Sequence, residues 1–271
     1  MKQVNAKVIA NAELLHIQGA KYFLMDIRWP GDIPACRPGQ FFMLQCGGDA
    51  MLRRPVSIHG AAQPGTLQFL YSVPDIDKGL GKAGGKGTHW LSGLAKGDDL
   101  NLIGPLGNGF SIDGPSKHLL VIAGGIGIAP LKYLAEYAVA DAKDITLLMG
   151  ARTAAALYPR KMLPHGVKTI IATDDGSQGT ESSVIDLVPQ YIGQADQVFA
   201  CGPVAMYQAM ADKTPDWAAH KPVQVSLEVR MGCGFGVCYG CSIKTKQGMQ
   251  LVCKEGPVFN IKDIIWQEVR I

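Results

Sequence analysis

The sequence has no long hydrophobic run. Its longest mostly apolar stretch, Val121 to Leu131, is about half of the ~20 residues that a membrane-spanning helix needs, and glycines interrupt it. The N-terminal residues 1–18 also lack the apolar stretch and the small-residue cleavage site of a signal peptide. We therefore expect a cytoplasmic protein without membrane insertion.

The sequence also lacks a strong charge imbalance. It contains 26 basic and 23 acidic residues, and no run of lysines and arginines supplies the basic footprint of a nucleic-acid-binding protein. With 271 residues, of which 47% are hydrophobic, the chain can instead form two or three modest globular domains. We expect no nucleic-acid partner.

Histidine is missing from the neighbourhood of the cysteines. The chain has seven cysteines, and four of them lie in the short segment "MGCGFGVCYGCS" and its continuation "LVCKEG". Such clustering is typical of a metal or redox site in a reducing compartment, not of a disulfide framework.

The hydrophobic pattern divides the chain into three parts. Residues 1–113 contain short apolar stretches separated by Gly, Pro and Asp, which predicts an antiparallel β-barrel or sandwich. Residues 114–218 alternate between strand and helix patterns, which predicts a Rossmann-like parallel α/β nucleotide domain. Residues 219–271 are rich in Gly and Cys and too few for a core of their own, so we expect a metal centre to organise them.

Two turns of the α/β part are candidates for a dinucleotide site. Gly124, Gly125 and Gly127 follow a buried strand and precede a helix, an arrangement in which a pyrophosphate can bind. Cys201, Gly202 and Pro203 follow a later strand, and the ends of parallel strands open onto one crevice. The glycine turn alone is also compatible with simple close packing, and the second turn alone with a buried free cysteine. Together they favour a nicotinamide nucleotide.

The β part contains a second set of candidate ligands. The stretch "RRPVSI" places Arg54 and Ser57 close together in the expected strand, and a guanidinium matches phosphate oxygens bidentately. The small-residue turn with Gly87 and Thr88 could face a pyrophosphate. An edge-strand arginine in a salt bridge is the alternative for the first motif alone. Both motifs together predict a second nucleotide cofactor.

The cysteines follow an iron-sulfur spacing. Cys233, Cys238, Cys241 and Cys253 give C-x4-C-x2-C-x11-C, and the first three match the plant-type pattern. Four thiolates can also form a closed structural zinc site, but zinc sites favour paired C-x2-C knuckles. Here one glycine-rich loop carries three ligands, which favours a [2Fe-2S] cluster over zinc. No C-x-x-C-H motif for haem attachment is present.

These motifs, in their order along the chain, resemble the ferredoxin reductase superfamily. The order is "RPVS", "GKGT", "GPLGNGF", "GGIGIAPL", "CGP" and "EVRMGCGFGVCYGC" with "VCKEGPVF". The last segment is the most specific, and with it the chain is similar to the electron transfer subunits of class 1B dihydroorotate dehydrogenases. The resemblance covers essentially the whole chain.

The resemblance implies FAD, a [2Fe-2S] cluster and NAD as cofactors. It assigns the cluster to the four cysteines and gives Cys201 a positioning role near the nicotinamide. It assigns FAD contacts to these residues: Arg54, Pro55, Val56, Ser57, Leu70, Tyr71, Ser72, Gly87 and Thr88. The chain departs from the family at Ser72, where a basic residue is usual, and in an inserted loop from Val73 to Gly85.

The resemblance also implies a partner. Dihydroorotate would be oxidised at the FMN of a separate catalytic subunit, and electrons would pass through the cluster and FAD to NAD⁺ within a heterotetramer of two copies of each chain. NAD rather than NADP follows mainly from the family, with Asp174 and Asp175 as acidic groups that could repel a 2′-phosphate. The alternatives are a subunit of a ferredoxin:NADP or sulfide oxidoreductase, and a non-enzymatic nucleotide-binding module with structural zinc.

Overall fold

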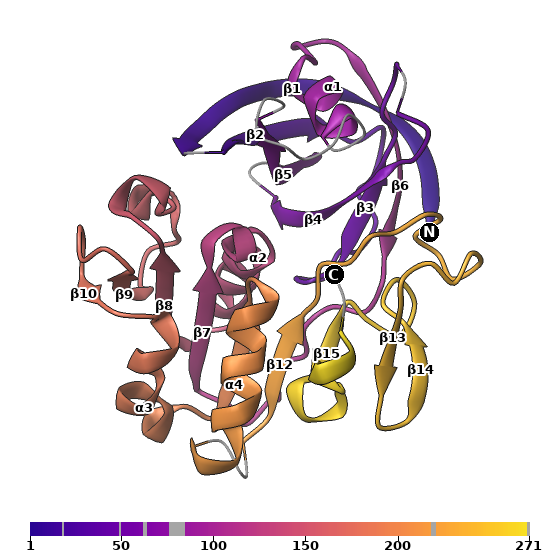
Figure 1. Cartoon of the computed structure of the whole chain (residues 1–271). Coiled ribbons are helices and arrows are strands. Elements are labelled where there is room, and N and C mark those ends of the chain that lie inside the picture. The colour runs from indigo at the N-terminus through magenta and orange to yellow at the C-terminus, as the bar shows by residue number, and fades with distance from the viewer. Residues whose placement is uncertain (18, 49, 62–63, 76–84, 218–220, 270–271) are drawn as a thin grey trace.

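The N-terminal part of the computed structural model is a closed six-stranded antiparallel barrel (Figure 1). The structure describes residues 1–17, 19–48, 50–61, 64–75, 85–217 and 221–269. The barrel strands follow the order β1-β2-β5-β4-β3-β6, and the short helix α1 lies beside β5. The bounds are β1 (Lys2–Ile17), β2 (Ala20–Arg28), β3 (Phe41–Leu44), β4 (Arg54–Gly60), β5 (Thr66–Pro74), α1 (Lys86–Ser92) and β6 (Asp99–Leu106).

Side-chain alternation explains the barrel. Along β6, buried residues alternate with partly exposed or exposed ones, as expected for a strand with one face toward a core. Phe42 is fully buried in that core and makes edge-to-face contacts with Trp29 and Phe69. The sequence-based prediction of an antiparallel β domain is confirmed.

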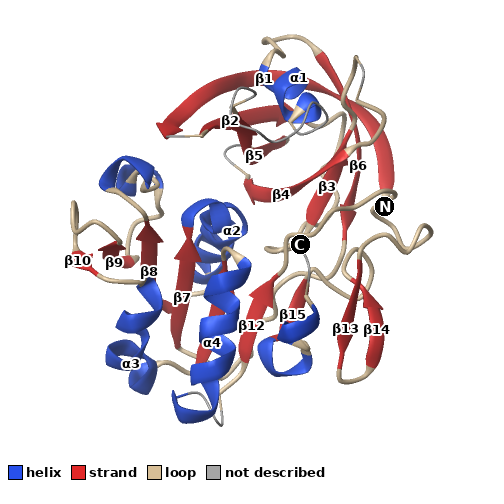
Figure 2. Cartoon of the chain, viewed as in Figure 1, coloured by secondary structure: helices blue, strands red, loops and turns tan. Residues whose placement is uncertain are grey.

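A seven-stranded sheet forms the second part, in the order β10-β9-β8-β7-β11-β12-β15. All its neighbours pair in parallel except β12 and β15. Helices cover its faces (Figure 2). The bounds are β7 (His118–Gly124), α2 (Ile128–Ala140), β8 (Asp144–Ala151), β9 (Lys168–Thr173), β10 (Thr180–Glu181), α3 (Val188–Tyr191), β11 (Gln197–Cys201), α4 (Val204–Trp217), β12 (Val223–Ser226) and β15 (Val258–Asn260).

The strand order places a topological switch point between β7 and β11. The chain moves from β7 outward through β8 and β9, and then returns to place β11 on the other side of β7. Ligands of open α/β sheets bind outside the carboxyl ends of the strands at such a point. Short 3₁₀ helices occupy Gly125–Gly127, Ala154–Ala156, Arg160–Met162, Val184–Leu187, Ile192–Gln194, Ile261–Asp263 and Trp266–Glu268.

The C-terminal segment shares its core with the rest of the molecule. Its hairpin consists of β13 (Ser242–Thr245) and β14 (Gly248–Leu251), while β12 and β15 hydrogen-bond into the large sheet. Buried Val252 and Trp266 belong to one core cluster with Met43 of the barrel. The tail is therefore packed by protein contacts, and the division at residues 113 and 218 stays a prediction. Within the described residues no helix is long and apolar enough to span a membrane.

Candidate functional site

A cavity of about 1110 Å³ opens between the barrel, the start of α2 and the segment before the cysteines. This volume is slightly above the usual range of small-molecule sites, as an extended dinucleotide requires. Eight of the positions expected to contact FAD line the cavity: Arg54, Pro55, Val56, Ser57, Leu70, Tyr71, Ser72 and Thr88. One wall therefore collects residues from β4, β5 and α1.

Gly87 has a different position from the other expected FAD contacts. It is buried and does not line the cavity, and a Cβ at this residue would lie 2.7 Å from Nε of Arg54. Gly87 thus leaves room for the arginine side chain. Arg54 Nη1 donates to the carbonyl oxygen of Leu52 at 2.7 Å, which holds the guanidinium at the cavity wall. Most of the inserted loop, residues 76–84, lies outside the described residues.

The segment Leu227–Met231 forms a cavity wall that the motifs did not reveal. Glu228 lines the cavity and is exposed to it, and desolvation by the neighbouring protein atoms raises the pKa of its carboxyl. Ile126 and Ala129, from the turn and first helical residues after β7, line the cavity as well. The available signal was the position of "LEVRM", which ends two residues before the first cysteine.

The two expected nucleotide turns lie side by side. A Cβ at Gly124 would lie 2.9 Å from Pro203 Cδ, so these turns are in contact. Gly125 has φ +54° and open space around its Cα, whereas a Cβ at Gly127 would lie 2.0 Å from the carbonyl oxygen of Cys201. Gly127 is thus needed for close packing, and Gly125 for its left-handed backbone. Figure 1 shows α2 between the sheet and the barrel.

Cys201 ends β11 and is fully buried. Burial is the largest cause that raises the pKa of its thiol, with the carboxyl of Glu228 acting in the same direction. A protonated thiol is a weak nucleophile, and Cys201 does not line the cavity. The neighbouring Gly202 N–H donates to the hydroxyl of Tyr207, which donates to the Ser226 carbonyl oxygen. This bridge fixes the turn after β11 to the end of β12.

The four clustered cysteines form two pairs of neighbours. Cys233 and Cys238 are neighbours, with the N–H of Cys233 donating to Sγ of Cys238 at 3.4 Å, and Cys241 and Cys253 form the second pair. Among the described residues, no three His, Cys, Asp or Glu side chains are gathered as for a single metal ion. Two thiol pairs, three thiols from the loop and Cys253 from the segment after β14, fit a two-iron cluster, in which each iron takes two cysteines.

Backbone amides of the same loop point at the thiols. The N–H of Gly236 donates to Sγ of Cys253 at 3.1 Å, and the N–H of Val237 donates to Sγ of Cys233 at 3.3 Å. Burial raises the pKa of the Cys233 thiol, but amide hydrogen bonds from Phe235, Cys238 and Val237 outweigh it and lower the pKa to about 6. Amide donors of this kind stabilise thiolate sulfur and tune a bound cluster.

Positive φ angles at Gly234 and Gly236 shape this loop. A Cβ at Gly234 would lie 2.4 Å from Cγ of Met43 in the barrel, so the loop packs closely on the flavin side of the molecule. The "GPLGNGF" turn of the barrel also meets the C-terminal segment: the N–H of Asn108 donates to the Gly256 carbonyl oxygen at 2.6 Å. The cysteine loop and the cavity are thereby held as neighbours.

The acidic pair Asp174 and Asp175 follows the end of β9. Oδ1 of Asp175 accepts a hydrogen bond from the N–H of Ser177 at 3.0 Å, and the Ser177 hydroxyl accepts one from the Ala154 N–H at 2.7 Å. These bonds join the turn after β9 to the turn after β8. The structure therefore places the pair at the same edge of the sheet as the glycine turns.

Family models match the part of the chain that carries the nucleotide turns and the part that carries the cysteines. Residues 121–212 match the family model of the oxidoreductase NAD-binding domain, and residues 228–265 match that of the iron-sulfur cluster binding domain of dihydroorotate dehydrogenase B. Among solved structures, the NADH-dependent reduced ferredoxin-NADP oxidoreductase shares the fold, with a TM-score of 0.80 at 24% identity over 97% of this chain and 90% of that one.

Curated relatives extend the likeness to the whole chain. The electron transfer subunit of dihydroorotate dehydrogenase B (NAD(+)) from Desulforamulus reducens is 34% identical over 98% of this chain and 99% of its own length. The protein of the same name from Caldanaerobacter subterraneus subsp. tengcongensis is 33% identical over 97% of this chain and 99% of its own length. The chain belongs to the family of dihydroorotate dehydrogenase B (NAD(+)) electron transfer subunits.

Proposed function

We propose that this chain passes electrons from an FMN-containing dihydroorotate dehydrogenase catalytic subunit, through a [2Fe-2S] cluster and FAD, to NAD⁺ in pyrimidine biosynthesis. One observation carries the proposal: the segment Leu227–Met231 lines the cavity, and the cysteine loop begins two residues later. When bound, a flavin exchanges electrons singly with an iron-sulfur cluster and in pairs, as hydride, with NAD⁺. The adjacency of cavity, cysteine loop and nucleotide turns supports this order.

Residues of the barrel would hold FAD. The Arg54 guanidinium supplies donors for a phosphate, and Ser57, Ser72 and Thr88 supply hydroxyl groups on the cavity wall. Leu70 and Tyr71 of β5 contribute an apolar wall against which a planar ring can pack. Cys233, Cys238, Cys241 and Cys253 would hold the cluster.

The NAD⁺ site would form at the two adjoining turns of the α/β sheet. Gly125 has open space around its backbone, whereas Gly124 and Gly127 pack closely against the second turn. Gly202 and Pro203 form that second turn. Buried Cys201 would position this second turn and take no part in bond making.

The cysteine loop would also meet the catalytic subunit. Its apolar side chains Phe235, Val237 and Tyr239 are 42%, 67% and 69% exposed, and Cys238 among them is exposed as well. Apolar side chains gathered on a surface loop mark protein-protein contacts. An electron carrier between two flavins must approach both, so we place the partner on this loop and expect two copies of each subunit.

Absorption spectroscopy tests the cofactors. The purified chain should show the bands of a flavin and of an iron-sulfur cluster in the visible range. A colourless, zinc-containing protein would contradict the proposal and favour a nucleotide-binding module. Co-purification tests the partner: a partner without FMN or without dihydroorotate oxidation would instead assign the chain to a ferredoxin:NADP or sulfide oxidoreductase.

Substitution of the exposed cysteine tests the order of transfer. Cys238→Ser should lower electron transfer from dihydroorotate to NAD⁺ by at least about a hundredfold, since one cluster ligand is lost. Oxidation of NADH by an artificial acceptor at the flavin should stay within about twofold. Equal loss of both activities would mean that the cysteine loop has only a structural role.

A further inference from the structure

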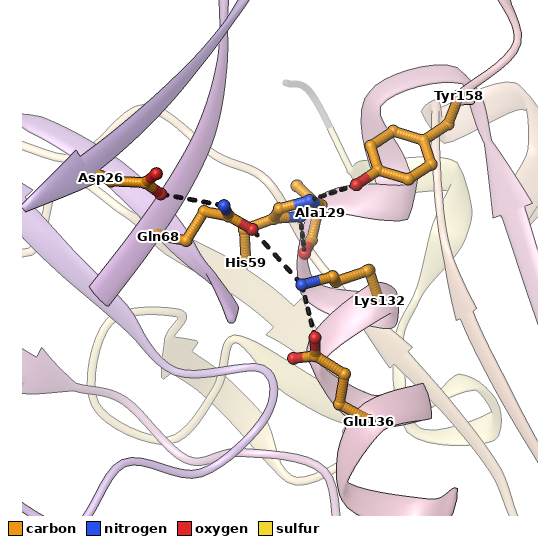
Figure 3. Close-up of polar contacts among 7 residues, drawn as sticks. All are labelled: Asp26, His59, Gln68, Ala129, Lys132, Glu136 and Tyr158. Carbon is orange, nitrogen blue, oxygen red and sulfur yellow. Dashed lines mark hydrogen bonds and ion pairs between the residues drawn. The ribbon is translucent and has the colours of Figure 1, made fainter. Parts of the chain in front are cut away.

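A histidine of the flavin strand is buried against the nucleotide-binding half of the molecule. His59 lies in β4, two residues after the cavity-lining Ser57, and its side chain is fully buried. Figure 3 shows that its hydrogen-bond partners, Ala129 and Tyr158, both come from the α/β part. The imidazole therefore bridges the two halves that would bind FAD and NAD⁺.

The partners determine which nitrogen of His59 carries the proton. Nδ1 lies 2.8 Å from the carbonyl oxygen of Ala129, which can only accept, so Nδ1 must be the donor. Nε2 then accepts from the hydroxyl of Tyr158 at 2.9 Å, and the two rings pack edge to face at 5.4 Å. A single neutral tautomer satisfies both bonds, which fixes the ring in one orientation.

One of these bonds ends on the wall of the cavity. Ala129 is the second residue of α2, it lines the cavity, and it follows Gly127 by two positions. A shift of the first turn of α2 relative to β4 would stretch the bond from His59 to Ala129. The same shift would move the glycine turn of the nucleotide site relative to the strand that carries Arg54 and Ser57.

A second polar chain ties α2 to the barrel one turn later. Nζ of Lys132 donates to Oε1 of Gln68 at 3.3 Å and pairs with Glu136 at 2.5 Å, and Nε2 of Gln68 donates to Oδ1 of Asp26 at 2.9 Å. Figure 3 shows these side chains beside His59 at the barrel face of the helix. Two attachments on successive turns restrain both the position and the tilt of α2.

A glycine next to His59 makes room for this second attachment. A Cβ at Gly60 would lie 2.7 Å from Nζ of Lys132 and 2.9 Å from Oε2 of Glu136. At the end of β4, His59 thus hydrogen-bonds to α2, and Gly60 leaves room for the side chains of that helix. The contact between β4 and α2 is therefore both closely packed and hydrogen-bonded.

We propose that His59 is a positioning residue, which, with Tyr158, sets the distance between the flavin on β4 and the nicotinamide at the turn before α2. The inference rests on the proposed function, since it presumes that both nucleotides bind. Hydride transfer requires reacting atoms about 3–3.5 Å apart, and a misplacement on the order of 1 Å can cost roughly a hundredfold in rate. A fixed bridge between the two walls supplies that precision.

Rapid-reaction kinetics of the full chain, loaded with FAD and cluster, tests the proposal. In His59→Phe, the rate of flavin reduction at saturating NADH should fall about tenfold or more, because the bridge to Ala129 is lost. The dissociation constant for NADH should change less than about threefold, since the nucleotide contacts themselves remain. The long-wavelength charge-transfer absorbance of the reduced flavin with NAD⁺ should weaken in parallel, because it depends on the overlap of the two rings.

Three further variants separate positioning from mere stability. His59→Asn keeps an amide donor near Nδ1 and should recover part of the rate, and Tyr158→Phe should slow reduction by about threefold through loss of one bond. Ile58→Val is the matched control, because Ile58 is the buried neighbour that faces the barrel core. This control should lower thermal stability and leave the reduction rate and the charge-transfer absorbance unchanged.

Two results would overturn the proposal. One is a wild-type rate and charge-transfer absorbance in His59→Phe, or in Tyr158→Phe if His59→Phe does not fold. The other is an equal slowing in Ile58→Val. A wild-type chain that binds no flavin, or whose flavin NADH does not reduce, overturns the proposed function and this inference together. If only the His59 variants give a result that contradicts this inference, the proposed function is unaffected.

Discussion

The interface between the barrel and α2 differs sharply from the cysteine loop. At the interface, His59 and Lys132 are buried and hydrogen-bonded to partners across the boundary. In the loop, Cys238 and Tyr239 are exposed, and amide-to-sulfur contacts replace a packed core. Protein groups alone therefore fix the first region, whereas the second presents donor atoms and apolar side chains to groups outside the chain.

Alanine substitutions at glycines near the two regions should differ most in their effect on stability. Gly127→Ala places a methyl group 2.0 Å from a backbone oxygen, so the free energy of unfolding should fall by about 3 kcal/mol. Gly240→Ala in the cysteine loop meets only Cys238 Sγ, at 3.6 Å, and should cost less than about 0.5 kcal/mol. Urea unfolding of both variants measures the difference. Similar losses in the two variants would show that the loop is packed as tightly as the glycine turn before α2.

Loss of Arg54 should weaken the cavity without unfolding the protein. Hydrogen bonds to charged groups contribute about 1.5–3 kcal/mol, so Arg54→Ala should lower FAD affinity roughly tenfold to a hundredfold. Equilibrium dialysis of the flavin measures this. Lys7→Ala is the control, because Lys7 forms an exposed ion pair with Asp99, and it should leave FAD affinity unchanged. Full FAD affinity in Arg54→Ala would remove the arginine from the flavin site.

Acid should weaken the interface through His59. Burial, with the nearby Lys132 charge acting in the same direction, lowers the pKa of His59 to about 3, below its ordinary value of 6.5. Between these values the unfolded chain binds a proton that the folded chain excludes, so stability is present above pH 6.5 and is lost as pH falls toward 3. From pH 7 to pH 5 this loss is about 2 kcal/mol.

The variant His59→Gln isolates that contribution. Glutamine does not titrate, so the loss of unfolding free energy from pH 7 to pH 5 should be smaller in the variant by about 2 kcal/mol. The other charged groups at this interface, Lys132 and Glu136, are present in both proteins and cancel in the difference. Equal acid sensitivity of the two proteins would mean that His59 is protonated in the folded chain.

Backbone strain gives the smallest and sharpest test. Gly125→Ala has open space for its methyl group but a φ of +54°, so it should lower stability by about 1 kcal/mol through strain alone. Gly236→Ala has φ +89° and meets only the flexible Lys254 side chain, and the exposed loop should relax so that stability falls by less than about 0.5 kcal/mol. Thermal unfolding compares them. Equal losses would place the cysteine loop within the cooperative core.

The sequence predicted the local elements well, for physical reasons. A buried strand, a glycine turn and an amphipathic helix require only neighbouring residues, and β7, Gly125 and α2 follow that pattern. The flavin residues picked out by resemblance line one cavity, with Gly87 as the exception. Their roles and those of Cys201 and the nucleotide turns stay predictions until ligands are bound.

Other parts of the site could not be predicted from local patterns. The stretch "VSIHG" gives no sign of the role of His59, because the hydrogen-bond partners of this residue lie 70 and 99 residues away. Leu227 and Val229 were assigned no role by any motif, yet they line the cavity because the sheet order brings them to it. The expectation that the tail has no core of its own agrees with the structure, but no local pattern revealed that Trp266 and Val252 pack into a core shared with the barrel.

The two domain types, the glycine turns and the spacing of four thiols follow from the amino-acid sequence, since these depend on periodicity and on residues close along the chain. Which of these features meet depends on the tertiary structure. It set α2 against β4 through His59, joined the tail to the large sheet through β15, and placed the cysteine loop beside the cavity. Such contacts arise from long-range packing and hydrogen bonding, which no short stretch of sequence encodes.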